Sequence, residues 1–221
     1  MGKRCALVLD LGGVLTPTLF ELHDETERAL RLAPGTLTWR GPFAPETDGL
    51  WQALRAGEID ERDYWRERAR EVGALLGEVW EDGAELFARA LGALPHAVLR
   101  PQAREALQAA RGLGAALALL PSSFDALGRL PLPRDFLARF DAILDGPNGG
   151  GHKPDPAAFG AAAQALGLAP EHCLCVDDAQ RNVAGARAAG MRALHFDVAR
   201  PAASFRAALR RLTEPDEETR E

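Results

Sequence analysis

The sequence predicts an α/β fold, in which a doubly wound parallel sheet carries a small all-helical domain, from three observations. Strand-length apolar runs without polar alternation occur at residues 5–9, 115–120 and 173–176, as expected for strands buried on both faces of a parallel sheet. Helical segments alternate with the later runs. Residues 17–92, which follow the first run, hold helical patterns and no convincing strand. The chain therefore combines a parallel core with a helical insertion.

The helices between the runs are marked by proline at their start and glycine after their end. They are expected at residues 101–111, before Gly112, then from Asp155 and Pro156 up to Gly167, and at residues 179–189, before Gly190. A weaker strand candidate covers residues 140–144. Strands that alternate with helices in this way form a doubly wound sheet with right-handed crossovers.

The helical insertion reads as a separate small bundle. Helices are expected at residues 50–56 and 60–72, the second with Asp60 as its N-cap, and one or two more within residues 75–90. Trp51, Tyr64 and Trp65 recur at helical spacing, which favours a shared apolar core over a ligand-stacking surface. The expected domains are a discontinuous core at residues 1–16 and 93–212, a helical domain at residues 17–92, and a disordered acidic tail at residues 213–221.

The composition excludes several classes of function. With 32 acidic and 26 basic residues the net charge is −6, so the chain has no general attraction for nucleic acid or anionic membranes. No run approaches the length of a membrane span. Of only three cysteines, Cys173 and Cys175 share one apolar run and read as small buried side chains. A low, odd cysteine count favours a reducing compartment, and we expect a cytoplasmic protein.

Polar residues that follow the apolar runs form the candidate site, because ligands of open parallel sheets bind beyond the carboxyl ends of the strands. They are Asp10, Gly12 and Gly13 after the first run, Ser122 and Ser123 after the second, Lys153 after the weaker candidate, and Asp177 and Asp178 after the third. Each alone is more simply explained as a helix cap, a turn or a solvated charge. Because such residues occur together at four strand ends, they indicate one site.

This set of side chains suits phosphate chemistry. Three carboxylates crowded at one edge repel one another and need a cation, and hard oxygen ligands suit Mg²⁺. A lysine beside them neutralises phosphate oxygens, and serine hydroxyls with loop N–H groups donate hydrogen bonds. Phosphoryl transfer asks mainly for such positioning and charge compensation, and a carboxylate can itself act as nucleophile. The sequence therefore predicts a site for a small phosphorylated metabolite.

Three motifs, in this order, resemble those of the haloacid dehalogenase superfamily, in its branch with a helical cap after the first strand. The motifs are Leu9-Asp10-Leu-Gly-Gly-Val-Leu15, Lys153-Pro154-Asp155-Pro156, and the segment 176–191 with Asp177, Asp178 and Asn182. The resemblance covers nearly the whole chain, from residue 7 to residue 194. Any one motif would be a weak signal, but together they are specific.

The resemblance implies a role for each matching residue. Asp10 would be the nucleophile, and Lys153 would bridge it to the phosphate. The implied Mg²⁺ ligands are Asp10, the backbone carbonyl of Gly12, Asp178 directly, and Asp177 directly or through water. The implied phosphate-binding groups are Gly12, Gly13, Lys153 and either Ser122 or Ser123. Asn182 would hold the Asp177–Asp178 loop in place.

Two positions depart from the family pattern. The family's phosphatases usually carry a second aspartate two residues after the nucleophile as general acid, and this chain has Gly12 there. The metal role survives because a backbone carbonyl serves it, but proton transfer to the leaving oxygen does not. Pro121 stands where the family places serine or threonine, so a hydroxyl has to come from Ser122 or Ser123.

The predicted activity is Mg²⁺-dependent hydrolysis of a phosphoric monoester through an aspartyl-phosphate on Asp10. Two alternatives stay open: a degenerate relative that binds metal or a phosphorylated ligand without efficient turnover, and a metal-free dehalogenase. The Asp177–Asp178 pair disfavours the dehalogenase, because a metal-free site has no need to concentrate negative charge.

By the resemblance, the cap closes over the site. An exposed apolar seam on the cap would allow a homodimer. His152 reads as an exposed loop residue. The histidines without an evident partner are His23, His96, His172 and His195.

Overall fold

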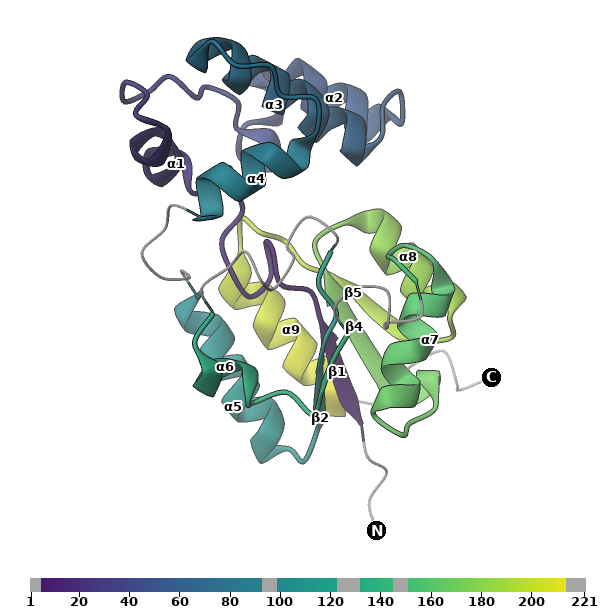
Figure 1. The fold of residues 1–221 in the computed structure, drawn as a ribbon. Coiled ribbons are helices and arrows are strands. Elements are labelled where there is room, and N and C mark those ends of the chain that lie inside the picture. Colours follow the sequence, from purple (N-terminus) through teal and green to yellow (C-terminus); the bar gives the residue numbers. More distant parts are fainter. Residues whose placement is uncertain (1–4, 93–98, 123–131, 145–150, 214–221) are drawn as a thin grey trace. The chain divides into compact units, whose positions relative to one another are not determined.

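The computed structural model describes residues 5–92, 99–122, 132–144 and 151–213, and it contains a five-stranded parallel sheet in the order β3-β2-β1-β4-β5 (Figure 1). The strands are β1 Ala6–Leu9, β2 Ala116–Leu119, β3 Ala142–Ile143, β4 Cys173–Asp177 and β5 Arg192–His195. The predicted α/β class is confirmed. The three strong apolar runs form β1, β2 and β4, and the weaker candidate at residues 140–144 contains β3.

The central position of β1 determines which side chains meet at the carboxyl edge of the sheet. On one side β1 pairs with β2, where Leu9 lies opposite Leu119. On the other side it pairs with β4, where Leu9 lies opposite Val176. Asp10 and Asp177 directly follow Leu9 and Val176. Parallel pairing therefore brings two carboxylates to neighbouring strand ends.

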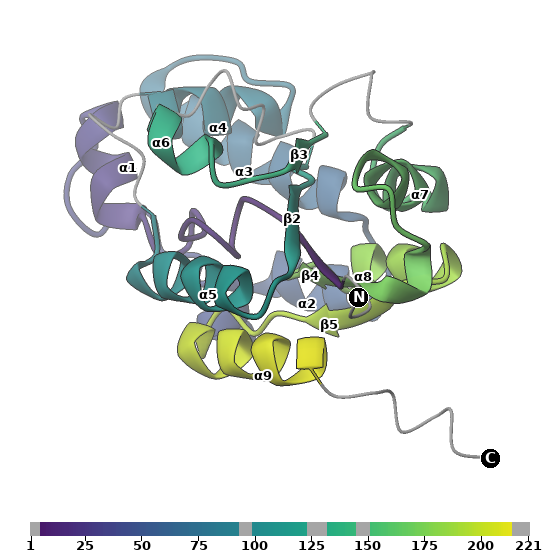
Figure 2. The same cartoon turned by 90° about the horizontal axis from the view of Figure 1, so that it is seen from below.

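Helices cover both faces of the sheet, as the alternation predicts. They are α5 Pro101–Gly112, α6 Arg134–Leu137, α7 Pro156–Ala165, α8 Gln180–Ala188 and α9 Pro201–Thr213. Figure 2 shows α5 and α9 on one side of the sheet and α7 and α8 on the other. The core against α7 and α8 includes the small side chains of Ala6, Ala118, Cys173 and Cys175. Both cysteines are buried in it, as expected, and their small size lets the alanine-rich α7 approach closely.

The sequence analysis did not predict strand β5 or helix α9. β5 is an edge strand in which Arg192 and Leu194 are half-buried, Ala193 is buried and His195 is exposed. A search for continuous apolar runs finds strands that are buried on both faces and misses an edge of this kind. The start of α9 was readable, because Pro201 occupies the first helical position that proline favours.

The chain divides into two compact units, and the second has only helices and turns among its described residues, 18–92. Its helices are α1 His23–Leu30, α2 Gly49–Ala56, α3 Glu61–Leu76 and α4 Gly83–Gly92. Asp60 caps α3 as predicted, accepting a hydrogen bond of 2.7 Å from the N–H of Asp63. The helix runs past its expected end at residue 72, and α1 was not expected. No helix in the described part of the chain is both long enough and apolar enough to cross a membrane.

Aromatic side chains fill the core of the helical unit. The ring centroid of Phe20 lies between 5.3 and 6.0 Å from those of Trp39, Trp51, Tyr64 and Trp65. Most of these contacts are edge-on or tilted, an arrangement that stabilises aromatic pairs beyond their burial alone. Trp51, Tyr64 and Trp65 therefore belong to the core of this unit, as their helical spacing predicted.

His23 has partners that its sequence context did not reveal. Its Nδ1 accepts a hydrogen bond of 2.8 Å from the Arg40 guanidinium, and its ring centroid lies 4.3 Å from that of Trp39. Burial, reinforced by the charge of Arg40, lowers the pKa of His23 to about 4. The imidazole is therefore neutral at neutral pH and acts as part of the core.

A buried ion pair lies beside the aromatic core. The Asp48 carboxylate accepts hydrogen bonds from the N–H of Gly41 at 3.1 Å and from the N–H of Trp51 at 2.9 Å. It also accepts one from the Tyr64 hydroxyl at 2.9 Å and one from the Arg68 guanidinium. Taking two ions out of water costs several kcal/mol per ion, which the charge pair and these hydrogen bonds offset. Removal of Asp48 would leave the Arg68 guanidinium with only the half-exposed Glu71 as its ion-pair partner among the described contacts, at 2.7 Å.

Asp48→Ala is expected to lower the free energy of unfolding of the helical unit by about 3–5 kcal/mol, because Arg68 loses its buried counter-charge. The chain's tryptophans all lie in this unit, at Trp39, Trp51, Trp65 and Trp80, so tryptophan fluorescence during urea unfolding reports on it selectively. Asp60→Ala removes an exposed N-cap and serves as control, with an expected loss of about 1 kcal/mol. Equal losses in the two variants would contradict the prediction.

Candidate active site

The ammonium group of Lys153 joins two carboxylates at the carboxyl edge of the sheet. Its Nζ donates to Asp10 Oδ1 at 2.6 Å and to Asp177 Oδ2 at 2.7 Å. All three side chains are at most 4% exposed. Burial alone would lower the pKa of Lys153, but the charges of Asp10 and Asp177 outweigh burial and raise it. Lys153 therefore carries a positive charge between two acidic groups.

The loop before α7 brings Lys153 to this edge. Asp155 caps α7 by accepting a hydrogen bond of 2.9 Å from the N–H of Ala157, as the Asp-Pro pair predicted. Helix α8 packs against the same loop, because a Cβ placed on Gly185 would lie 2.0 Å from the carbonyl oxygen of Pro154. Only glycine permits this close approach. Helix α8, which follows Asp177 and Asp178 in the chain, thus holds the loop of Lys153 in place.

Both oxygens of the Asp177 carboxylate accept hydrogen bonds. Its Oδ1 accepts from the N–H of Ala179 and from the Asn182 side chain, each at 2.9 Å, and its Oδ2 accepts from Lys153. Asn182 is buried in the first turn of α8. One oxygen from each of Asp10, Asp177 and Asp178 lies within 4.8 Å of the others. The fold therefore brings together the three carboxylates that the sequence analysis selected.

Gly13 lies directly against the carboxylate of Asp178. Its φ of 77° is in the left-handed region, and a Cβ at this position would be 2.2 Å from Asp178 Oδ2. Both the backbone conformation and the available space therefore require glycine. The loop after β1 thus touches the loop after β4, with Gly12 half-buried between Asp10 and Gly13.

Arg100 holds the loop after β1 from a segment that the sequence analysis did not select. Its Nε donates to the carbonyl oxygen of Gly13 at 3.1 Å, and its backbone N–H donates to that of Leu15 at 2.9 Å. The residue is only 5% exposed. The buried guanidinium and the backbone N–H of the same residue thus each bind one carbonyl of this loop and order it. In the sequence, Arg100 stands one residue before a proline-started helix and looks like an ordinary flanking charge.

The donor set fits a divalent metal ion. Asp10, Asp177 and Asp178 offer hard carboxylate oxygens within the span of a single ion, and Gly13 leaves room for the third of them. Lys153 balances part of the negative charge, but the three carboxylates still leave an excess of two negative charges. A bound dication would compensate that excess.

The family model of the haloacid dehalogenase-like hydrolases matches residues 6–190. The chain belongs to this hydrolase family. Asp10, Lys153, Asp177 and Asp178 all fall within the matched segment, so the resemblance of the motifs at the sequence level is confirmed. The branch of the family with a cap after the first strand stays a prediction.

This hydrolase is similar to the following two named proteins and one solved structure. A phosphoserine phosphatase of Thermus thermophilus is 38% identical over 161 residues, which are 72% of this chain but only 62% of that protein. Protein CbbY of Cupriavidus necator is 33% identical over 198 residues, 84% of this chain and 75% of the relative. The structure of an L-2-haloacid dehalogenase from Xanthobacter autotrophicus is 24% identical, covers 87% of this chain and 77% of its own, and has a TM-score of 0.58. At 24% identity this comparison shows a shared fold only, and it says nothing about the chemistry of the present chain.

The predicted phosphate-binding serines are only partly described. Ser122 is half-buried and follows Pro121 beyond the end of β2, at the same edge of the sheet as Asp10. Ser123 lies outside the described residues. His152 is exposed, as its loop position predicted. The hydroxyl that would replace the family's serine or threonine therefore stays a choice between Ser122 and Ser123.

His195 contradicts the expectation that it has no partner. Its Nε2 lies 2.8 Å from the backbone carbonyl oxygen of Asp178. The residue ends β5, the strand that the sequence analysis missed, and it pairs in register with Asp177. In the sequence, the available signal was that His195 ends a short apolar segment after Gly190. Because β5 was not predicted, the residues that neighbour His195 in the sheet could not be predicted either.

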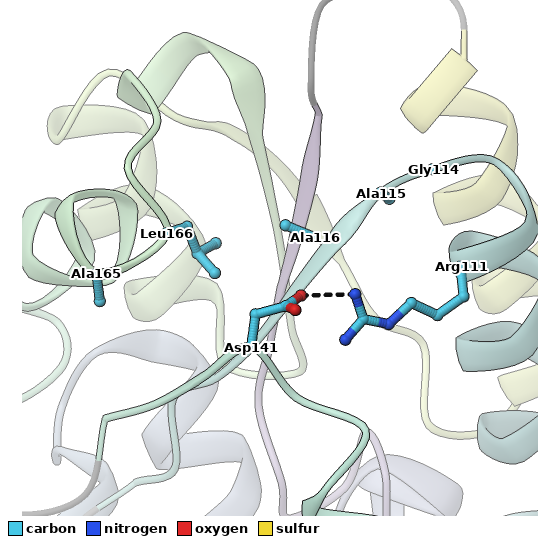
Figure 3. Close-up of a pocket in the computed structure, with 7 residues that line it drawn as sticks. All are labelled: Arg111, Gly114, Ala115, Ala116, Asp141, Ala165 and Leu166. Carbon is cyan, nitrogen blue, oxygen red and sulfur yellow. Dashed lines mark ion pairs between the residues drawn. The ribbon is translucent and has the colours of Figure 1, made fainter.

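A cavity of about 140 Å³ lies at the opposite edge of the sheet from Asp10. It is lined by Arg111, Gly114, Ala115, Ala116, Asp141, Ala165 and Leu166 (Figure 3). Arg111 and Asp141 form an ion pair of 2.7 Å across it, in which both side chains are about 40% exposed. The cavity lies near the start of β2, whereas Asp10 follows the end of β1, so it is separate from the candidate active site.

Gly13→Ala is expected to weaken Mg²⁺ binding by about tenfold or more, because the added methyl group would displace the Asp178 carboxylate. Gly57→Ala is the matched variant, since Gly57 has a similar φ of 76° but no atom within 4 Å of an added Cβ. Both variants bear the cost of left-handed backbone, so only the collision differs. Isothermal titration calorimetry measures the affinities, and unchanged Mg²⁺ binding by Gly13→Ala would contradict the prediction.

Proposed function

We propose that this hydrolase is a Mg²⁺-dependent phosphatase that cleaves the monoester of a small phosphorylated metabolite through an aspartyl-phosphate on Asp10. The observation that carries the proposal is the Lys153 ammonium held between Asp10 and Asp177, with Asp178 within reach of a shared ion. Two of its relatives are called phosphatases, the phosphoserine phosphatase and a phosphatase of Mycobacterium tuberculosis. Their names agree with the chemistry of the side chains.

In the proposed reaction, a carboxylate oxygen of Asp10 attacks phosphorus and the bond from phosphorus to the ester oxygen breaks. The ester oxygen leaves with the bonding electron pair and takes a proton from solvent water; a second water then hydrolyses the aspartyl-phosphate, which regenerates the Asp10 carboxylate and releases inorganic phosphate. Lys153 keeps Asp10 oriented and compensates the negative charge of the phosphoryl oxygens as they approach. The N–H groups of Gly12 and Gly13, with the hydroxyl of Ser122 or Ser123, are proposed to bind those oxygens.

The proposed Mg²⁺ ligands are Asp10, the carbonyl of Gly12, and Asp178, with Asp177 as a second or water-mediated ligand. Both oxygens of Asp177 already accept hydrogen bonds from Lys153, Ala179 and Asn182, which favours Asp178 as the direct ligand. When bound, Mg²⁺ would supply a positive charge that offsets the charge of the phosphoryl group.

Asp10→Asn is expected to reduce turnover of p-nitrophenyl phosphate on the order of 10⁴-fold or more, because the amide is not a nucleophile. Asp60→Asn, at a helix cap in the other unit, should leave turnover unchanged. The assay contains Mg²⁺ and is repeated with a panel of sugar phosphates. Tight ligand binding without turnover would instead indicate the degenerate binding protein, and halide release from a haloacid without metal would indicate the dehalogenase.

Gly12 cannot protonate the leaving oxygen, and we infer that the preferred substrates have leaving groups that need little protonation, such as sugar 1-phosphates or acyl phosphates. The rate is expected to fall steeply as the pKa of the leaving group rises across aryl and alkyl phosphates. Gly12→Asp should raise the rate on alkyl phosphates by about 10²- to 10⁴-fold, because it adds a general acid. A flat dependence in the unaltered enzyme, with chemistry rate-limiting, would contradict the inference.

A further inference from the structure

We propose that His195 is a positioning residue that holds Asp178 in place through a hydrogen bond to its backbone. The inference deepens the proposed function, because it rests on Asp178 as a metal ligand. It concerns a residue on β5 that belongs to none of the sequence motifs.

The direction of the hydrogen bond at His195 is fixed by chemistry. Its Nε2 lies 2.8 Å from the carbonyl oxygen of Asp178. A carbonyl oxygen can only accept a hydrogen bond, so Nε2 carries the hydrogen and donates it. This holds for the neutral Nε2–H tautomer and for the protonated ring, so the contact does not depend on titration of the imidazole.

The peptide unit between Asp178 and Ala179 is also held at its other end. The N–H of Ala179 donates to Asp177 Oδ1 at 2.9 Å, while the carbonyl of Asp178 accepts from His195. The two polar groups of one planar peptide are thus fixed by two different elements, β4 and β5. Because this peptide sets the direction in which the Asp178 backbone leaves its Cα, fixing it limits where the carboxylate can point.

The side chain of His195 is not needed to complete the sheet. The backbone ladder between β4 and β5 already continues past it, because the N–H of Phe196 donates to the carbonyl of Asp177 at 2.9 Å. The residue is exposed, so its ring is not part of the apolar core. Packing therefore does not explain a histidine here. The hydrogen bond that Nε2 donates to the Asp178 carbonyl does explain it.

The test compares donor and non-donor side chains at this position. His195→Gln places an amide N–H about where Nε2 lies, and His195→Leu removes the donor. His172→Leu is the matched control, because His172 precedes the start of β4, at the opposite end of that strand from Asp177. His195→Leu is expected to weaken Mg²⁺ binding by about tenfold, and His195→Gln to stay within about threefold of the unaltered chain. His172→Leu should bind Mg²⁺ as the unaltered chain does.

Two readouts keep failure of the positioning role distinct from failure of the proposed metal site. Calorimetry measures Mg²⁺ affinity, and hydrogen exchange of residues 177–182 in metal-free protein measures how firmly the loop is held. Faster exchange in His195→Leu, restored in His195→Gln, supports the positioning role. Unchanged exchange, or equal Mg²⁺ affinity of His195→Leu and the unaltered chain, overturns it. If the unaltered chain binds no Mg²⁺, the proposed metal site falls and exchange alone decides the role of His195.

Discussion

The buried ammonium of Lys153 between Asp10 and Asp177 is the interaction on which the rest of the site depends. Strand order places β1 beside β4, and the register then forces the carboxylates that follow Leu9 and Val176 together. Without a cation between them, two such closely spaced buried charges would repel each other. The Lys153 ammonium lies between them and offsets this repulsion.

Close backbone approaches and hydrogen bonds to backbone carbonyls position this charged cluster. Gly13 and Gly185 let neighbouring loops approach more closely than any side chain would permit. Arg100 and His195 then bind the backbone carbonyl oxygens of Gly13 and Asp178. The loops that carry Asp10 and Asp178 are thereby held in place through the main chain.

The helical unit has a polar core of its own around Asp48 and Arg68. Its four tryptophans and the buried ion pair all lie within this unit. Sequence periodicity was sufficient to find α2, α3 and α4, but it missed α1. It was not sufficient to find Asp48, because a carboxylate before a helix looks like a simple cap, and only its contacts with Tyr64 and Arg68 distinguish it.

The sequence by itself determined the parallel α/β class, the helical insertion, and the polar groups that follow each strand, because apolar runs and proline–glycine punctuation are local signals. Only the tertiary structure decided that Lys153 lies between Asp10 and Asp177, residues separated from it by 143 and 24 positions. It also decided the contacts of Arg100 and His195, one beside a helix start and one on an edge strand without a continuous apolar run. Such contacts depend on strand order and loop approach, which no local pattern encodes.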